Sequence, residues 1–201
     1  MHFTHVANLP SIIRAGGLRA DVTLRAEGTD VHECADRNIK ERRRAKRVRV
    51  RPYGVVGDYV PFYYAPRSPM LHKIHRGSVE GYNEGQDPLV YIVTTIETVD
   101  QAGCRWVGSD GNCAASVTRV FDDRQQLEGA VDWQIMNEVI WKNTVDDGDR
   151  MRRRMAEFLV HRELPWSCVK AIVVKDDTRR AQVTACVPTA TRVEVKRGWY
   201  Y

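Results

Sequence analysis

The first eighteen residues, MHFTHVANLPSIIRAGGL (residues 1–18), set the pattern from which the fold can be worked out. Successive side chains of a strand point to opposite faces, so in His2-Phe3-Thr4 the two polar side chains share one face and Phe3 takes the other. These residues are therefore predicted to form a strand, with His2 and Thr4 together at its edge.

A short helix is predicted to follow this strand. Asn8 is of a residue type that caps helix N-termini, and the apolar side chains of residues 9–13 recur at helical spacing. The pair Gly16-Gly17 then ends the pattern.

The remaining chain alternates short apolar runs with a few helical stretches, while residues 20–37 show no periodicity. Pro66 and Pro69 are predicted to form a stiff turn after the first of these runs. Strands are expected at residues 60–64, 89–95, 155–160, 170–174 and 191–195, and helices at residues 38–48, 133–141 and 178–185. No glycine-rich phosphate loop accompanies them. The pattern indicates an α+β fold and excludes a doubly wound α/β sheet.

Length and composition describe one compact domain spanning residues 1–201. Hydrophobic residues make up 43% of the chain, which is typical of a globular protein, yet no apolar run approaches the roughly 20 residues that a membrane span needs. The N-terminus lacks the basic and apolar regions of a signal peptide. We expect a cytoplasmic protein that does not contact a membrane.

The cysteines and histidines give no metal-binding pattern. The five cysteines are scattered without a Cys-x-x-Cys pair, which favours reduced thiols. The histidine pairs His2/His5 and His72/His75 have no acidic residue at the spacing of a metal site. No metal is expected.

Positive charge is concentrated in one segment, RNIKERRRAKRVRVR (residues 37–51), where nine Lys or Arg residues face one Glu. Such a run creates a local field that attracts polyanions. A solvated helix face is the alternative interpretation, and the charge alone does not exclude it.

Glu157 is the carboxylate with the most informative surroundings. It lies where the basic segment NTVDDGDRMRRR gives way to the apolar run after it, so a strand would hold its side chain at the mouth of a cleft. The alternative is a surface glutamate on the outer face of that strand.

Six segments, in this order, resemble the DarT family of DNA ADP-ribosyltransferase toxins from DarT–DarG toxin–antitoxin pairs. They are HFTHVANLPSIIRAGGL, NIKERR, DYVPFYYAPRSPML, SDGNCAAS, RRRMAEFLV and RGWYY, and they extend across essentially the whole chain. The resemblance implies an ADP-ribosyltransferase fold, with two small packed β-sheets and flanking helices around a cleft for NAD. It also implies transfer of ADP-ribose from NAD to thymidine in single-stranded DNA, with release of nicotinamide.

The resemblance assigns NAD-binding and catalytic roles to particular residues. Arg43 and Glu157 are the expected catalytic residues, with Arg42 or Arg44 as one-step alternatives to Arg43. An arginine suits this role because its planar fork binds phosphate bidentately and stays charged. The segment of about residues 24–45 is expected to fold over NAD. The expected NAD-binding residues are His2, Phe3, Thr4, Ser11, Arg43 and Tyr63.

DNA recognition is assigned to the other side of the cleft. The loop of about residues 109–157 resembles the family's substrate-recognition loop, and the basic residues 37–51 border the same cleft. The last arginines of the loop lie in a segment that looks too polar for the core, so they are expected to contact phosphates. The expected DNA-binding residues are Arg67, Met70, Asn112, Arg152, Arg153 and Arg154.

Single-stranded DNA and a DarG-like macrodomain antitoxin are the partners that the resemblance implies, and the protein is expected to be a monomer. Two alternatives remain open at this point. One is an ADP-ribosyltransferase that modifies guanine, RNA or protein, and the other is a catalytically inactive, basic nucleic-acid-binding module.

Overall fold

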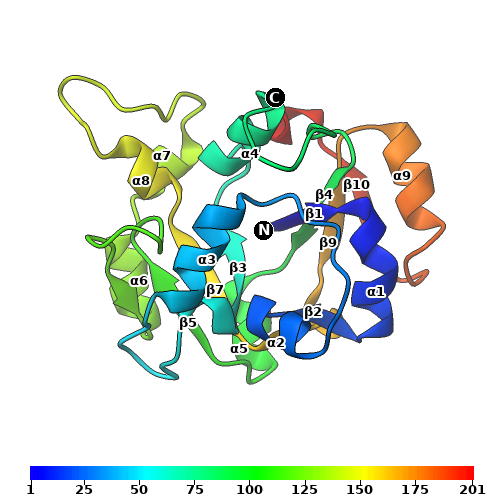
Figure 1. Ribbon diagram of the computed structural model, residues 1–201, viewed down its shortest axis with the longest axis horizontal. Coiled ribbons are helices and arrows are strands. Elements are labelled where there is room, and N and C mark those ends of the chain that lie inside the picture. Colours follow the sequence, from blue (N-terminus) through cyan, green and yellow to red (C-terminus); the bar gives the residue numbers. More distant parts are fainter.

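The computed structural model describes residues 1–201, and two four-stranded sheets form its centre (Figure 1). The first sheet has the strand order β1-β4-β9-β10. Its strands are β1 (His2–His5), β4 (Leu89–Val93), β9 (Ala171–Val174) and β10 (Val193–Val195). Only β9 and β10 run parallel. The predicted first strand is confirmed as β1.

The second sheet has the order β3-β7-β5-β6 and is antiparallel throughout. Its strands are β3 (Tyr59–Tyr63), β7 (Glu157–His161), β5 (Trp106–Ser109) and β6 (Val120–Phe121). The register places Tyr63 opposite Glu157. A separate pair joins β2 (Gly17–Arg19) to β8 (Glu163–Pro165).

Nine short α-helices surround the sheets. Figure 1 shows α1 and α9 beside the first sheet, α6, α7 and α8 at the far side of the second, and α3 in front of β3 and β7. The helices are α1 (Leu9–Arg14), α2 (Asp21–Ala26), α3 (Arg37–Ala45), α4 (Pro69–His75), α5 (Ile96–Gln101), α6 (Arg124–Ala130), α7 (Trp133–Asn137), α8 (Arg150–Arg154) and α9 (Asp177–Thr184).

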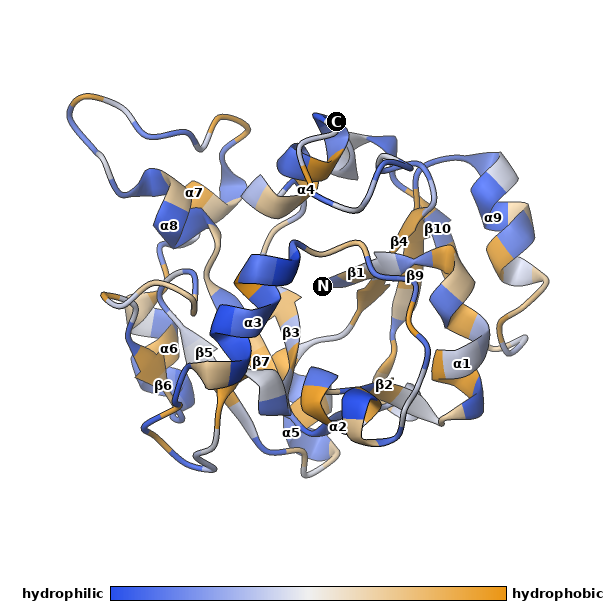
Figure 2. Ribbon diagram, viewed as in Figure 1, coloured by the Kyte–Doolittle hydropathy of each residue, from blue (hydrophilic) through white to orange (hydrophobic).

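The largest hydrophobic core lies between the two sheets. Val90 and Ile92 of the first sheet share one cluster of buried side chains with Phe62 and Phe158 of the second. The central strands are accordingly the most apolar parts of the ribbon in Figure 2. Burial of each such side chain contributes roughly 1.5–3 kcal/mol. The predicted α+β class with two packed sheets is confirmed.

Several local predictions are corrected. Helix α2 lies within residues 20–37, where no regular structure was predicted, and residues 69–75 form helix α4 where a stiff turn was expected. Helix α3 ends at Ala45, before the predicted residue 48, because the chain turns extended at Lys46 and pairs Arg47 with Val55. No helix has both the length and the apolar character needed to cross a membrane.

Asn8 occupies the N-cap position of α1 as predicted, but its side chain makes no capping hydrogen bond. Its side-chain amide instead donates hydrogen bonds to Thr4 Oγ1 and to the carbonyl of His32, each at 3.0 Å, while its oxygen accepts from His32 N–H at 2.8 Å. Asn is a favourable N-cap residue, but here the side-chain amide of Asn8 is used for hydrogen bonds to Thr4 and to the segment before α3.

Candidate active site

A cavity of about 550 Å³ is lined by residues of β1, β3 and α3, among others. This volume is in the range of ligand pockets that bind small molecules. All the residues predicted to bind NAD or to catalyse line it, together with two of the predicted DNA-binding residues. They are His2, Phe3, Thr4, Ser11, Arg43, Tyr63, Met70, Asn112 and Glu157. The sequence thus predicted correctly that these residues share one cleft.

Glu157 is the first residue of β7 and lies deep in this cavity with 1% of its surface exposed. Its carboxylate accepts two hydrogen bonds from Arg43 Nη1, at 2.7 and 3.0 Å, and a third from Cys113 N–H at 3.0 Å. The interpretation of Glu157 as a surface glutamate is therefore wrong. A rigid strand and three donors hold this carboxylate in place.

Ser109, at the end of β5, fixes the main chain of Glu157. Its hydroxyl accepts from Glu157 N–H at 3.0 Å and donates to the Gly111 carbonyl at 2.7 Å, and the residue is fully buried. Ser109 and the Cys113 amide were not predicted as site residues. Their only signal in the sequence is that they belong to the SDGNC segment. The sequence alone does not reveal that the strand before this segment pairs with the strand that begins at Glu157.

Arg43 comes from the last turn of α3, whose start is capped by Asp36. Burial lowers the pKa of the Arg43 guanidinium, but the charge and hydrogen bonds of Glu157 act together with the nearby Cys113 and Tyr63 and raise the pKa overall. Arg43 makes hydrogen bonds to the protein through Nη1 only. Its Nε and Nη2 donors therefore remain available to an anionic ligand in the cavity.

The two neighbours of Arg43 point elsewhere, because consecutive helical residues are about 100° apart. Arg44 pairs with Asp21, and Arg42 is exposed and bonds the carbonyl of Asn38 in its own helix. Of the three arginines considered from the sequence, only Arg43 faces Glu157.

His2 is held as a neutral ring. Its Nδ1 lies 2.8 Å from the carbonyl oxygen of Pro61, which only accepts, so Nδ1 carries the proton. Burial lowers the pKa of His2 to about 4. Nε2 of this ring is consequently an acceptor at neutral pH, and the ring lines the cavity. A ligand hydroxyl or amide N–H is a suitable partner for it.

Aromatic side chains form one wall of the cavity. Phe3 and Tyr63 stack with their ring centroids 6.2 Å apart, and Phe3 also meets Tyr91 edge to face. Burial and the negative charge of Glu157 raise the pKa of Tyr63, so its hydroxyl stays protonated. Ser11 reaches the same cavity from α1, where its hydroxyl donates to the Asn8 carbonyl.

The predicted DNA-binding residues separate into two groups. Met70 of α4 and Asn112 line the cavity, and Asn112 is oriented by Ala114 N–H, which donates to its side-chain oxygen at 2.9 Å. Arg67 does not line it. Its guanidinium lies 4.7 Å from the centroid of the Tyr201 ring, a cation–π arrangement.

The three arginines of α8 also lie outside the cavity. Arg152 pairs with Asp149 and Asp110, and Arg153 pairs with Asp132 and Asp147. These carboxylates occupy the guanidinium groups that were predicted to contact DNA phosphates.

Arg154 contradicts the expectation of an exposed, polar segment, because only 4% of its surface is exposed. It donates to the carbonyls of Ile135, Met136 and Pro66 at 2.6 to 2.7 Å. Two of these carbonyls belong to the last turn of α7, so Arg154 caps that helix. The helix predicted to reach Trp141 accordingly ends at Asn137.

Comparison with known proteins agrees with this geometry over the whole chain. A family model described as "ssDNA thymidine ADP-ribosyltransferase, DarT" matches residues 1–201. A DNA ADP-ribosyl transferase of Thermus sp. (strain 2.9) is 34% identical, with 100% of this chain and 94% of the relative covered.

Two solved structures of the Thermus sp. 2.9 DarT resemble this one. The complex with ADP-ribosylated single-stranded DNA gives a TM-score of 0.88 at 32% identity and covers 100% of this chain and 94% of that one. The complex with NAD+ gives 0.86 at 30% identity, with 100% and 96% covered. Fold and cleft together define an ADP-ribosyltransferase. More narrowly, the chain belongs to the DarT family of DNA-modifying toxins, and NAD is its co-substrate.

Proposed function

We propose that this protein transfers ADP-ribose from NAD to a ring nitrogen of thymidine in single-stranded DNA, with Glu157 and Arg43 as its catalytic residues. The observation that carries the proposal is the buried Arg43–Glu157 pair at the end of a cavity lined by His2, Thr4 and Tyr63. Membership of the DarT family supports the choice of acceptor.

Glu157 supplies negative charge where positive charge develops. As the bond between nicotinamide and ribose breaks, the ribose becomes oxocarbenium-like, and a carboxylate bonded to its 2′-hydroxyl stabilises this state more than the ground state. A thymine ring nitrogen then attacks from the opposite face and forms the new carbon–nitrogen bond, nicotinamide leaves as a neutral molecule, and the proton of the ring nitrogen passes to water. The three hydrogen bonds that hold Glu157 mean that little reorganisation is needed.

Arg43 has two tasks in this scheme. Through Nη1 it orients the Glu157 carboxylate, and its remaining donors bind the anionic part of NAD. His2 accepts a hydrogen bond from the nicotinamide ribose or amide, Thr4 and the Phe3 backbone contact the same end, and Ser11 lies nearer the phosphates. Tyr63 is adjacent to the nicotinamide.

We place the DNA strand along the side of the cavity formed by Met70 and Asn112, with Arg67 beside it. We keep Arg152 and Arg153 as phosphate contacts. In this proposal each guanidinium group binds a DNA phosphate and its aspartate partners at the same time. Replacing both by Gln should reduce the slope of log affinity against log salt by roughly 0.7 per lost contact. An unchanged slope would remove both residues from the DNA path.

We further propose that the protein acts as a single-domain monomer and that a macrodomain antitoxin opposes it by removing the ADP-ribose mark. The partnership is inferred from the toxin–antitoxin character of the DarT family. Incubation of modified DNA with a macrodomain hydrolase should restore the unmodified strand.

Labelled NAD and short oligonucleotides test the proposal directly. A thymine-containing single strand should acquire label. The same strand with its thymines replaced, the duplex of the thymine-containing strand and the RNA of matching sequence should not. Label on guanine, RNA or protein would replace the acceptor, and binding of DNA without any labelling would replace the enzyme by a binding module. Glu157→Gln serves as the inactive control.

A further inference from the structure

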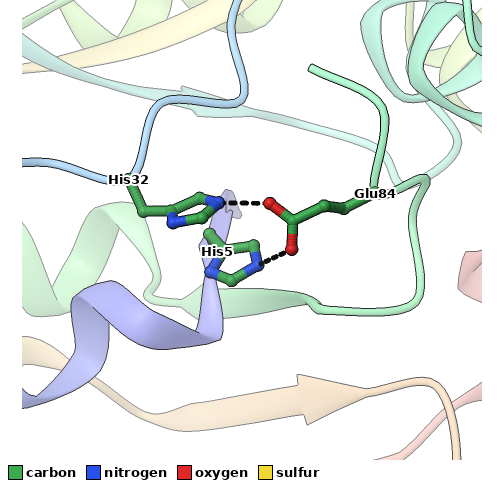
Figure 3. A group of neighbouring side chains, drawn as sticks. All are labelled: His5, His32 and Glu84. Carbon is green, nitrogen blue, oxygen red and sulfur yellow. Dashed lines mark hydrogen bonds and ion pairs between the residues drawn. The ribbon is translucent and has the colours of Figure 1, made fainter.

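A second polar cluster, separate from the Arg43–Glu157 pair, is formed by side chains from three segments of the chain. His5 of β1, His32 of the segment before α3 and Glu84 of the loop before β4 have side-chain ligand atoms within 4.8 Å of one another. Figure 3 shows Glu84 reaching both imidazole rings, one with each carboxylate oxygen. His32 lies 27 positions after His5, and Glu84 lies 52 positions after His32, so no local sequence motif indicates the cluster.

The contacts tie three chain segments together. His32 Nε2 lies 2.5 Å from one oxygen of Glu84, and His5 Nε2, which is buried, lies 3.3 Å from the other. The two rings stack with their centroids 3.8 Å apart. The pKa of Glu84 lies below its usual range because His32 donates a hydrogen bond to it, so the carboxylate stays charged.

The segment that contains His32 separates two cavities. Residues 27–36, here called the strap, connect α2 to α3 without regular structure between residues 29 and 36. Val31, His32, Glu33 and Ala35 line the NAD cavity on one side and a second cavity of about 690 Å³ on the other. With space on both sides, the middle of the strap depends on specific anchors for its position.

His32 is held in place through both its main chain and its ring. Asn8 holds its main chain with one accepted and one donated hydrogen bond, and Glu84 holds its ring. The same Asn8 side chain donates to Thr4, a residue of the NAD cavity. The position of the strap and the position of Thr4 are therefore linked through one amide.

We propose that His5, His32 and Glu84 form a latch that holds the strap closed beside the NAD cavity, and that the latch strengthens NAD binding. The inference rests on the function proposed above. The three act as positioning residues, because none of them touches the reacting atoms.

The hydrogen-bond pattern favours shared protons over a bound metal ion. Ala7 N–H donates to His5 Nδ1 at 3.1 Å, so this nitrogen is an acceptor, and burial lowers the pKa of His5, which keeps the ring neutral. A neutral ring with an accepting Nδ1 carries its proton on Nε2. That protonated atom lies 3.3 Å from a Glu84 oxygen without forming a hydrogen bond, and it has no lone pair to offer a metal.

The test compares Glu84→Ala with Glu80→Ala, a matched change at an exposed glutamate of the same loop that makes no ion pair. Glu84→Ala should raise the KM for NAD about fivefold, the scale of one lost charge-assisted hydrogen bond, with less than a twofold change in kcat. Hydrogen exchange of the strap amides should accelerate in Glu84→Ala without NAD, and Glu80→Ala should match the wild type.

The outcomes separate the latch from the proposed function. Unchanged exchange of residues 27–36 would overturn the latch, whatever the activity. Faster exchange with an unchanged KM would overturn its link to NAD. A wild-type protein that fails to label thymidine would sink the proposed function, yet the exchange result would still decide the latch. Stabilisation of the wild type but not of Glu84→Ala by Zn²⁺ would replace the proton latch by a metal site.

Discussion

Helices α3 and α8 both carry three consecutive arginines in their last turn, Arg42 to Arg44 and Arg152 to Arg154, yet the two triplets make different contacts. In α3 one arginine faces the Glu157 carboxylate, one pairs with Asp21 and one is exposed. In α8 two are held by aspartates and the third is buried against carbonyl groups.

The difference lies in the partners that surround each helix. Arg43 meets a single carboxylate in a cavity and keeps donors free for a ligand, whereas each arginine of α8 binds two or more acceptors of the protein. The buried Nε of Arg154 is the exception among these donors, because it has no partner. A basic run therefore predicts a ligand site only where its donors exceed the acceptors that the fold provides. The following predictions test this contrast, beginning with the largest effect.

Removing the carboxylate that Arg43 faces should have the largest effect. Glu157→Gln should reduce modification of thymidine by on the order of 10² or more, because a neutral amide does not stabilise the ribosyl cation. Glu163→Gln, at an exposed position of the neighbouring β8, should behave as the wild type. Near-normal labelling by a folded Glu157→Gln variant would disprove the catalytic assignment.

Substitution within the α3 triplet should distinguish its members. Arg43→Lys should reduce kcat/KM by about 10- to 100-fold, since a point charge cannot both orient Glu157 and bind phosphate as a fork. Arg42→Lys should leave kcat/KM within about twofold, because its side chain is exposed and bonds only its own helix. If Arg42→Lys proved the more damaging change, the essential arginine would be displaced by one position.

Within α8 the largest effect should be on stability, not on the chemical step. Arg154→Met should lower the free energy of unfolding by about 2 kcal/mol, because the buried carbonyls of Ile135, Met136 and Pro66 lose their donor. Arg153→Met should cost less than about 1 kcal/mol, since its ion pairs are partly exposed. Urea denaturation measures both, and equal stability of Arg154→Met and the wild type would contradict the capping role.

The remaining arginines of α8 should show the smallest effect, and it should depend on pH. Hydrogen bonds from Arg153 and Arg152 lower the pKa of Asp147 and Asp149, respectively. Depressed folded-state pKa values stabilise the fold above the unfolded value of about 3.9, and this stabilisation is lost as the pH falls through the folded values. The stability difference between wild type and Arg153→Gln should therefore be present at pH 7 and vanish near pH 2. A difference that persisted there would have another cause.

Much of the fold was predictable because its strands carry local signals. The runs that became β4 and β9 are continuous apolar segments, and β7 contains the apolar run Phe158–Val160 after Glu157. Such runs indicate buried strands. Helix α8 had no such signal. Its sequence RMRRR offers no apolar stripe, and aspartates from other parts of the chain hold its side chains.

The site was predictable only through the motifs it shares with the DarT family. Arg43 and Glu157 are separated by 114 positions, so neither periodicity nor spacing could pair them. The cluster of His5, His32 and Glu84 was missed for the same reason, since the sequence pairs His5 with His2 and gives no hint of Glu84. Such separations in sequence are closed only by tertiary contacts, such as the pairing of β1 with β4 that brings His5 near the loop of Glu84.

Cys113, whose amide donates to Glu157, also has a thiol close to that carboxylate. That thiol is buried, and burial together with the charge of Glu157 raises its pKa, so it resists alkylation while the cleft keeps this arrangement. Cys186 is exposed and gives an internal reference for reagent access. The extent of alkylation at Cys113 relative to Cys186 can be measured by mass spectrometry of their peptides. This ratio reports how often the surroundings of the Glu157 carboxylate open to solvent, and it needs no introduced fluorophore.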